Sequence, residues 1–269
     1  MSPYAPDERV MVSPRYMAGA RDRIADVIGP LIHLFGWKLE HDVGNGDVGI
    51  DSPDGSVSVD FVPLHPLGRW CTVVHHEPYW EAVFSRQAPL EAVAAFTQAL
   101  PQLLGDDRHA EKIPVTRKPL DQVAALNGWS AEGSSFVSPD LYCRIEHTPD
   151  ADDAWKVEHV YFEKDPLATF MRRTPEHCVG NFFAHLATPI AVERAFADIP
   201  LSTRYEHSGL ITLVRGAAIN PPVAHALDTA WPAFTAEPPA GAEPPPPVPR
   251  PAAQRTSAAT PTPSAGRRR

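Results

Sequence analysis

The residues best suited to metal chemistry form a short run, His75-His76-Glu77, with His65 ten residues upstream. Imidazole and carboxylate groups are common zinc ligands, but a site needs three or four of them to converge. In a strand, neighbouring side chains point to opposite faces, so His75 and His76 do not face the same ion. The run therefore indicates a polar cluster at a strand end. Metal binding is the weaker interpretation, and we expect no metal or other cofactor.

The other patterns examined for catalysis are weak. Twelve histidines and many aspartates allow a Ser–His–Asp triad to be drawn on paper, but the Gly-x-Ser-x-Gly elbow is missing. Gly44-Asn45-Gly46 is too short for a phosphate-binding loop and predicts a hairpin turn. The carboxylate pairs Asp106-Asp107 and Asp152-Asp153 fall in predicted linkers or turns, where charge is ordinarily solvated. We assign no catalytic residue, and an enzymatic function ranks behind binding.

A second set of residues is aromatic or imidazole and falls on predicted strands. Trp and Tyr are enriched at protein interfaces, although Trp at matched strand positions usually packs in a core. Alternation places Trp155, Val157, His159 and Tyr161 on one face of a strand. Core packing and a ligand- or partner-binding sheet face both remain open. The candidate binding residues are Trp70, His75, Trp80, Trp155, His159 and Tyr161.

Charge separates the chain into an acidic body and a basic tail. Residues 237–269 contain ten prolines, five arginines and two glutamates, with no aromatic residue, which predicts a disordered Pro/Ala/Arg-rich tail. The tail therefore has a formal charge of +3, and because the total is −9, residues 1–236 have a formal charge of −12. An acidic body disfavours contact with phosphate. The leading hypothesis is a non-enzymatic binding or scaffold protein with a protein partner. The alternative is nucleic-acid association through the sheet aromatics and the basic groups Arg15, Arg21 and Arg23, Arg172-Arg173 and Arg267 to Arg269.

The expected compartment is the cytoplasm. Met1 to Val12 lacks the apolar run of a secretory signal, and no window approaches the roughly 18 apolar residues of a membrane span. Cys71, Cys143 and Cys178 are an odd number without CxxC spacing. This favours free thiols over disulfides or a zinc knuckle, and we expect no membrane contact.

The chain repeats itself at an offset of 86 residues. Ser52-Pro53-Asp54 recurs as Ser138-Pro139-Asp140. At the same offset, seven residues between Ala82 and Leu100 match their counterparts between Ala168 and Leu186. Trp70 matches Trp155 at an offset of 85 instead of 86, as a one-residue difference in loop length would produce. Matches at a constant offset over more than thirty residues indicate a tandem duplication.

Each copy shows the same order of elements, which predicts an α+β fold. A short helix ends at Gly36-Trp37 or Gly128-Trp129, about four antiparallel strands follow, and a closing helix begins near Pro89 or Pro175. The apolar spacing of Val93, Phe96 and Leu100, repeated in the second copy, predicts packing of each closing helix on the sheet. The predicted divisions are 12–105 and 119–190 for the two repeats, 191–236 for an extension with a hairpin over residues 203–215, and 237–269 for the tail.

These motifs resemble one family. The paired Ser-Pro-Asp turns, the Gly-Trp segments and the opening Val12–Gly19 are similar to the SPDY-motif domain, an uncharacterised family of filamentous actinobacteria often found in two copies per chain. The name motif is imperfect, because Gly55 follows the first turn and Leu141 precedes Tyr142 after the second. The resemblance covers roughly residues 12–190. It supports the domain layout and implies no activity, cofactor or catalytic residue.

Overall fold

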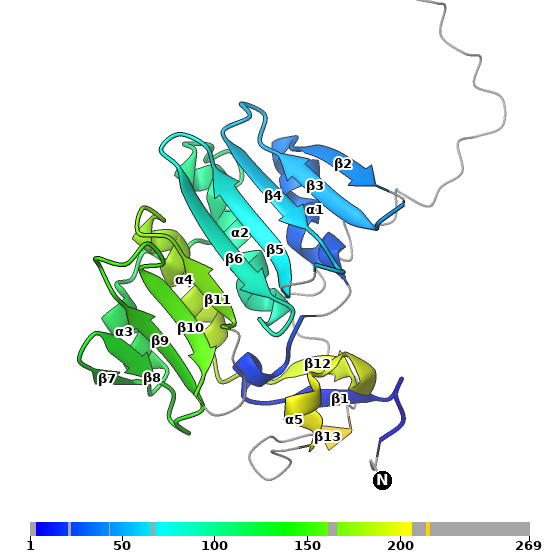
Figure 1. Ribbon diagram of the computed structural model, residues 1–269, viewed down its shortest axis with the longest axis vertical. Helices are drawn as coiled ribbons and strands as arrows, with labels where there is room; N and C mark the ends of the chain where they lie inside the picture. Colours follow the sequence, from blue (N-terminus) through cyan, green and yellow to red (C-terminus); the bar gives the residue numbers. More distant parts are fainter. Residues whose placement is uncertain are drawn as a thin grey trace, which may run out of the picture. The chain divides into compact units, whose positions relative to one another are not determined.

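The computed structural model describes residues 4–20, 23–42, 44–65, 68–160, 166–205 and 214–215, all within a compact unit of residues 1–220. Two copies of one unit follow each other (Figure 1). The first copy contains α1 (Ile24–Phe35), β2 (Lys38–Asp42), β3 (Asp47–Asp51), β4 (Val57–Phe61), β5 (Arg69–His75), β6 (Trp80–Ser85) and α2 (Leu90–Leu103). The second contains α3 (Leu120–Leu126), β7 (Ser130–Glu132), β8 (Ser135–Val137), β9 (Cys143–His147), β10 (Trp155–His159), β11 (Ala168–Phe170) and α4 (Glu176–Ala187). The duplication is confirmed, with five strands per copy where about four were expected.

The two copies share one ten-stranded antiparallel sheet, in the order β2-β3-β4-β5-β6-β11-β10-β9-β8-β7. They meet at β6 and β11, where Val83 lies opposite Thr169 and Phe84 lies opposite Ala168. Val83 and Thr169 are equivalent positions, so the junction has an approximate two-fold axis between them. The whole sheet therefore consists of two equivalent halves related by this axis.

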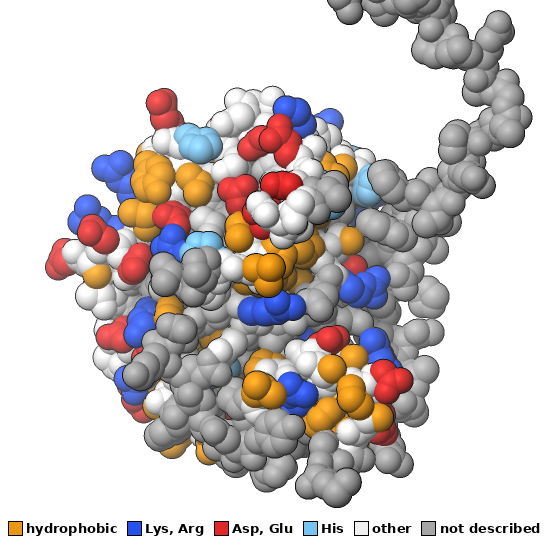
Figure 2. Space-filling model, turned by 45° about the vertical axis from the view of Figure 1, so that its right-hand side comes forward, with side chains coloured by type: hydrophobic (Ala, Val, Ile, Leu, Met, Phe, Trp, Pro, Cys, Tyr) orange, Lys and Arg blue, Asp and Glu red, His pale blue; other side chains and the backbone are white. Residues whose placement is uncertain are grey.

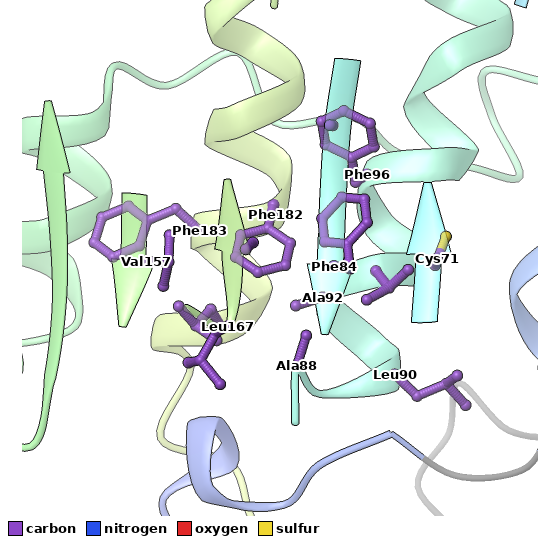
Figure 3. Close-up of a cluster of buried hydrophobic side chains, with 14 of the residues drawn as sticks. Cys71, Phe84, Ala88, Leu90, Ala92, Phe96, Val157, Leu167, Phe182 and Phe183 are labelled. Atoms are coloured by element: carbon purple, nitrogen blue, oxygen red, sulfur yellow. The ribbon is translucent and has the colours of Figure 1, made fainter. Parts of the chain in front are cut away.

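All four of these helices cover the same face of the sheet (Figure 1). They lie side by side in the order α1, α2, α4, α3. Strand side chains that point toward the helices are buried, among them Val73, Phe84 and Val157. The apolar stripe of each closing helix is buried as well, with Phe96 and Phe182 fully shielded from solvent, so the sheet-packing prediction is confirmed (Figure 3). Among the described residues, no helix lies across the opposite face of the sheet (Figure 1).

The two Ser-Pro-Asp turns have the same hydrogen bonds. Ser52 Oγ donates to Asp54 Oδ1 at 2.6 Å and accepts from the amide of Val57 at 3.0 Å. Ser138 Oγ makes the equivalent bonds in the second copy, to Asp140 at 2.6 Å and from Cys143 at 2.9 Å. Each motif therefore closes the hairpin between the third and fourth elements of its copy.

Those turns differ in one backbone feature. The residue after each Asp has a left-handed backbone, with φ +70° at Gly55 and φ +67° at Leu141. Among the described residues, Leu141 is the only non-glycine with positive φ. This conformation is easy for glycine and strained for leucine. The second turn thus has the same backbone geometry as the first, although leucine disfavours this conformation.

A small three-stranded sheet joins the N-terminal segment to the chain beyond α4. Its order is β12 (Val192–Ala195), β1 (Arg9–Val12), β13 (Val214–Arg215). The guanidinium of Arg194 is fully buried, donates to both carboxylate oxygens of Glu91 at 2.9 and 2.6 Å, and donates to the carbonyl of Gly19 at 3.2 Å. This ion pair, between the buried Arg194 and the 29% exposed side chain of Glu91, connects β12 to the first turn of α2. The short helices η1 (Arg15–Met17) and η2 (Phe196–Asp198) flank the sheet strands in sequence.

Residues 206–213 of the hairpin predicted over residues 203–215 lie outside the described residues, and the described ends of that segment differ from the prediction. Residues Leu201–Tyr205 form the short helix α5, and β13 pairs with β1 rather than with a neighbouring strand. The hydroxyl of the buried Thr203 donates to the carbonyl of Met17 at 2.9 Å. This long-range contact, invisible in the local pattern, ties the segment to η1. The tail at 237–269 lies outside the described residues.

Candidate functional site

Five of the six candidate binding residues lie in the core. Trp70, His75, Trp80, Trp155 and His159 are each no more than 9% exposed, and Tyr161 lies outside the described residues. Strand alternation, together with this burial, directs the side chains of Trp80, Trp155 and His159 toward the helices. We therefore assign the five side chains to core packing and withdraw the binding face they were expected to form. The pattern of alternation was predicted correctly, but not which face meets solvent.

His75 packs inside the first copy. Its ring stacks on Trp80 with centroids 5.4 Å apart, and its Nδ1 lies 2.9 Å from the carbonyl oxygen of Pro78. His76 and Glu77 are exposed at the following turn. Over the described residues, no three His, Cys, Asp or Glu side chains are arranged to hold a metal ion.

His159 occupies the position in the second copy that His75 occupies in the first. His75 lies opposite Val57 and His159 lies opposite Cys143, and Val57 and Cys143 correspond at the offset of 86. The two histidines are 84 rather than 86 residues apart because two connections differ in length between the copies. Counted between equivalent residues, the connection from β4 to β5 is two residues longer than that from β9 to β10, and the connection from β10 to β11 is two residues longer than that from β5 to β6. This compensated shift is the signal that the sequence comparison missed.

The same shift corrects the equivalence of the tryptophans. Cys71 lies opposite Phe84, and Trp155 lies opposite Phe170. Since Phe84 and Phe170 are equivalent, Trp155 corresponds to Cys71 rather than to Trp70. A bulge between Arg69 and Cys71 places Trp70 beside that position.

His159 and Tyr16 make buried polar contacts that connect β10 to η1. A carbonyl only accepts hydrogen bonds, so His159 Nε2 donates to the Tyr16 carbonyl, 2.9 Å away. Its Nδ1 is buried without a partner, and burial lowers the pKa of the ring. The Tyr16 hydroxyl donates to Asp140, and burial raises the pKa of this phenol. The Tyr16 ring also packs edge-on against Trp129, with centroids 5.8 Å apart. The arrangement anchors η1 to the second Ser-Pro-Asp turn.

The uncovered face of the sheet offers a different candidate surface. A contiguous set of half-buried, uncharged side chains crosses β4, β5, β6 and β11, and we call it the central patch: Ser58, Thr72, Val74, Val83, Ser85 and Thr169. Val83 is flanked by Thr72 on one side and Thr169 on the other, and Ser58 lies opposite Val74. The patch therefore runs from the first copy to the axis between the copies.

The equivalent positions of the second copy are charged. Ser58, Thr72 and Val74 correspond to Arg144, Lys156 and Glu158 through the strand register. There, Lys156 Nζ lies 2.5 Å from a carboxylate oxygen of Glu158. The two copies thus differ at these three surface positions, which are uncharged in the first copy and charged in the second. The patch is bordered by two acidic residues of the first copy, with Asp60 opposite Thr72 and Glu81 opposite Val74.

A small pocket adjoins the central patch at the β5–β6 turn. Its volume is about 190 Å³, and its lining residues are Tyr79, Asp152, Met171, Arg172 and Arg173. We call it the Tyr79 pocket. The amide of Met171 donates to the carbonyl of Glu81 in β6 at 2.9 Å, which fixes the pocket to the edge of the patch. Sequence reasoning missed it because it joins a turn of the first copy to loops of the second.

A larger hollow of about 430 Å³ lies over the outer strands of the first copy. It has an acidic lining that includes Glu40, Asp42, Asp47 and Asp60, together with His41. Burial and the nearby Asp51 raise the pKa of Asp60. We assign no ligand to this hollow, because acidic side chains alone do not identify one.

The fold and these surfaces define a duplicated α+β protein, with one helix-covered sheet face and one open face. Comparison with protein families identifies the duplicated unit: residues 51–102 and 137–192 each match SPDY, a domain of unknown function (DUF317). The chain contains tandem copies of this domain, as the resemblance predicted. Each structural repeat begins earlier than its matched segment, because α1, β2 and most of β3, or α3, β7 and most of β8, lie before it. No curated protein and no solved structure matches the chain. Within the described residues, no helix is long and apolar enough to cross a membrane.

Proposed function

We propose that this protein is a non-enzymatic binding module whose central patch contacts a protein partner. The observation that carries the proposal is the uncharged central patch, on a sheet face that no described helix covers, with Asp60 and the ion pairs Arg69–Glu81 and Lys156–Glu158 beside it. Protein interfaces commonly have an uncharged centre and a charged rim. The Tyr79 pocket adds Tyr, Met and Arg, which are types enriched at interfaces.

The arrangement of arginines weighs against the nucleic-acid alternative. Among the described residues of the predicted basic groups, Arg15 is buried, Arg23 is paired with Asp26, and Arg172 and Arg173 lie at the Tyr79 pocket. On the face shown in Figure 2, Lys and Arg side chains of the described residues lie among acidic ones rather than in a stripe. Nucleic acid binding normally needs a continuous basic surface. The buried tryptophans are also unavailable for base stacking.

Buried free cysteines support an intracellular location. All three cysteines are free and buried, and burial raises the pKa of each thiol. Free thiols of this kind are typical of reducing compartments. The tail, with its five arginines, would act as a tether or a weak electrostatic contact.

The second copy supplies the test of the central patch. In the variant Thr72→Lys/Val74→Glu, the first copy receives the residues that the second copy carries at the same positions. The new lysine lies opposite Asp60 and the new glutamate opposite Glu81, so circular dichroism and thermal unfolding first establish that the variant folds. The matched control is Lys156→Thr/Glu158→Val, the opposite exchange. Affinity capture from a host lysate, with and without nuclease, is followed by cross-linking of any captured protein.

We expect wild type and the control to capture the same nuclease-resistant partner, and the patch variant to lose it. Unchanged capture by the patch variant would show that the interface lies elsewhere. Loss of the partner after nuclease treatment would favour the nucleic-acid alternative.

A further inference from the structure

The Tyr79 pocket indicates which chemical group the partner presents, an inference that rests on the proposed function. The pocket volume of about 190 Å³ is below the roughly 300–1,000 Å³ of small-molecule sites. Its size therefore suits one side chain or one chain terminus. Because it adjoins the central patch, a partner lying on the patch would reach it.

One side of the pocket is apolar and fixed in place. Tyr79 is 49% exposed, and its hydroxyl donates to Glu81 Oε2 at 3.3 Å. Met171 is half-buried, and its amide bonds to the carbonyl of the same Glu81. Both residues are thus tied to β6, and the pocket presents an aromatic ring and a thioether to a ligand. Such groups favour an apolar or aromatic side chain.

The other side is cationic. The amide of Arg172 donates to the carbonyl of Asp152 at 2.9 Å, which holds the loop, while the side chains of Arg172 and Arg173 are exposed. Neither side chain has an ion pair or hydrogen bond within the described part of the chain. Arginines that do pair with carboxylates there are Arg9, Arg23, Arg69, Arg108, Arg144 and Arg194.

The charges of the lining residues favour an anionic ligand group. With the carboxylate of Asp152, the lining has a formal charge of +1 in a protein whose total charge is −9. Guanidinium groups bind carboxylates through paired, charge-assisted hydrogen bonds.

We propose that the Tyr79 pocket binds a carboxylate of the partner together with an adjacent apolar side chain. Arg172 and Arg173 bind the carboxylate, and Tyr79 and Met171 contact the apolar group. The carboxylate comes from a chain terminus or from an Asp or Glu side chain.

The test uses the full chain labelled with [methyl-¹³C]methionine. The sequence has four methionines, so Met171 gives one of at most four methyl signals, and Met17, which is 2% exposed, serves as an internal control. Substitution Met171→Leu assigns the signal. The probes are N-acetylphenylalanine, which has a terminal carboxylate, N-acetyl-Phe-Glu-amide, which has only a side-chain carboxylate, and the neutral N-acetylphenylalaninamide.

We expect at least one acidic probe to shift the Met171 methyl signal with a Kd of roughly 1–10 mM, and the neutral amide to bind at least about tenfold more weakly. The stronger of the two acids identifies the source of the carboxylate. Arg172→Gln/Arg173→Gln should weaken binding of the acids about fivefold or more. The control Arg9→Gln, at an exposed arginine paired with Glu193 in the small sheet, should leave it unchanged.

Three results would overturn the proposal. They are equal shifts from the acids and the amide, no Met171 shift from any probe up to about 20 mM, and a shift from inorganic phosphate as strong as that from the acids. The last would mean a simple anion site without recognition of the apolar group. A failed pocket leaves the Thr72→Lys/Val74→Glu capture result unaffected, so failures of the two proposals are distinguishable.

Discussion

Replacement of Phe96 or Phe182 by alanine should destabilise the protein by similar amounts. The two rings are equivalent and fully buried, and each contacts both Phe84 and Phe170. Figure 3 shows Phe84 between the two closing-helix rings, Phe96 and Phe182. Within a copy, the ring centroids are 5.2 Å apart for Phe84–Phe96 and 5.4 Å for Phe170–Phe182. Between copies, both distances are 5.4 Å, with interplanar angles of 35° and 34°. The environments of the two rings are therefore nearly the same.

The expected cost follows from this packing. A buried Phe→Ala change leaves a cavity and typically costs about 3–5 kcal/mol. For a folded unit of this size, that corresponds to a fall in Tm of roughly 6–20 °C. Because each ring bridges both copies, each variant should still unfold in a single transition, with the two free energies of unfolding within about 1 kcal/mol of each other.

Urea unfolding followed by tryptophan fluorescence and by circular dichroism measures both quantities. Near-wild-type stability in either variant would contradict the packing of that closing helix on the sheet. A biphasic transition in which one copy unfolds first would contradict the shared core at the axis. A large difference between the two variants would contradict the symmetry argument even if both helices pack as described.

Three further predictions concern the turns, the buried ion pair and the tail. Leu141→Gly should raise the free energy of unfolding by about 1 kcal/mol in urea titrations, because it relieves a left-handed leucine, and Gly55→Leu should lower it by a similar or larger amount; a destabilising Leu141→Gly would contradict this. Glu91→Gln should cost about 3–5 kcal/mol, since it leaves the buried guanidinium of Arg194 unpaired. Burial alone would raise the pKa of Glu91, but the charge of Arg194 outweighs it, and the pKa is lowered. The wild type should therefore lose this stability as pH falls below 4.5. The stability of Glu91→Gln should depend less on pH over the same acidic range in pH-dependent unfolding. Deletion of residues 237–269 should change the Tm by no more than about 2 °C in calorimetry, because that segment has little apolar area to bury, and a larger fall would mean that it docks.

The repeat and its elements were readable from local patterns. The matched Ser-Pro-Asp turns, the Gly36 helix stop and the stripe that includes Phe96 depend on contacts within a few residues or on helical periodicity, which a sequence displays directly. The start of α1 at Ile24 could not be predicted in the same way, because no side-chain cap marks that boundary. The helix over Leu201–Tyr205 was missed because its stabilising contact, from Thr203 to Met17, joins residues far apart in the chain.

The sequence by itself determined that this chain is a duplicated α+β unit with an acidic body, and it specified which residues alternate along each strand. It did not determine which strand face is buried, because alternation is the same for either face until a helix covers one of them. Only the tertiary structure decided that Trp80 and Trp155 face the helices, while Thr72 and Val83 face outward. Pairing of β6 with β11 also placed Tyr79 beside Arg172, two residues that no local pattern connects. A surface formed across two repeats depends on strand order and register, which are global properties of the folded chain.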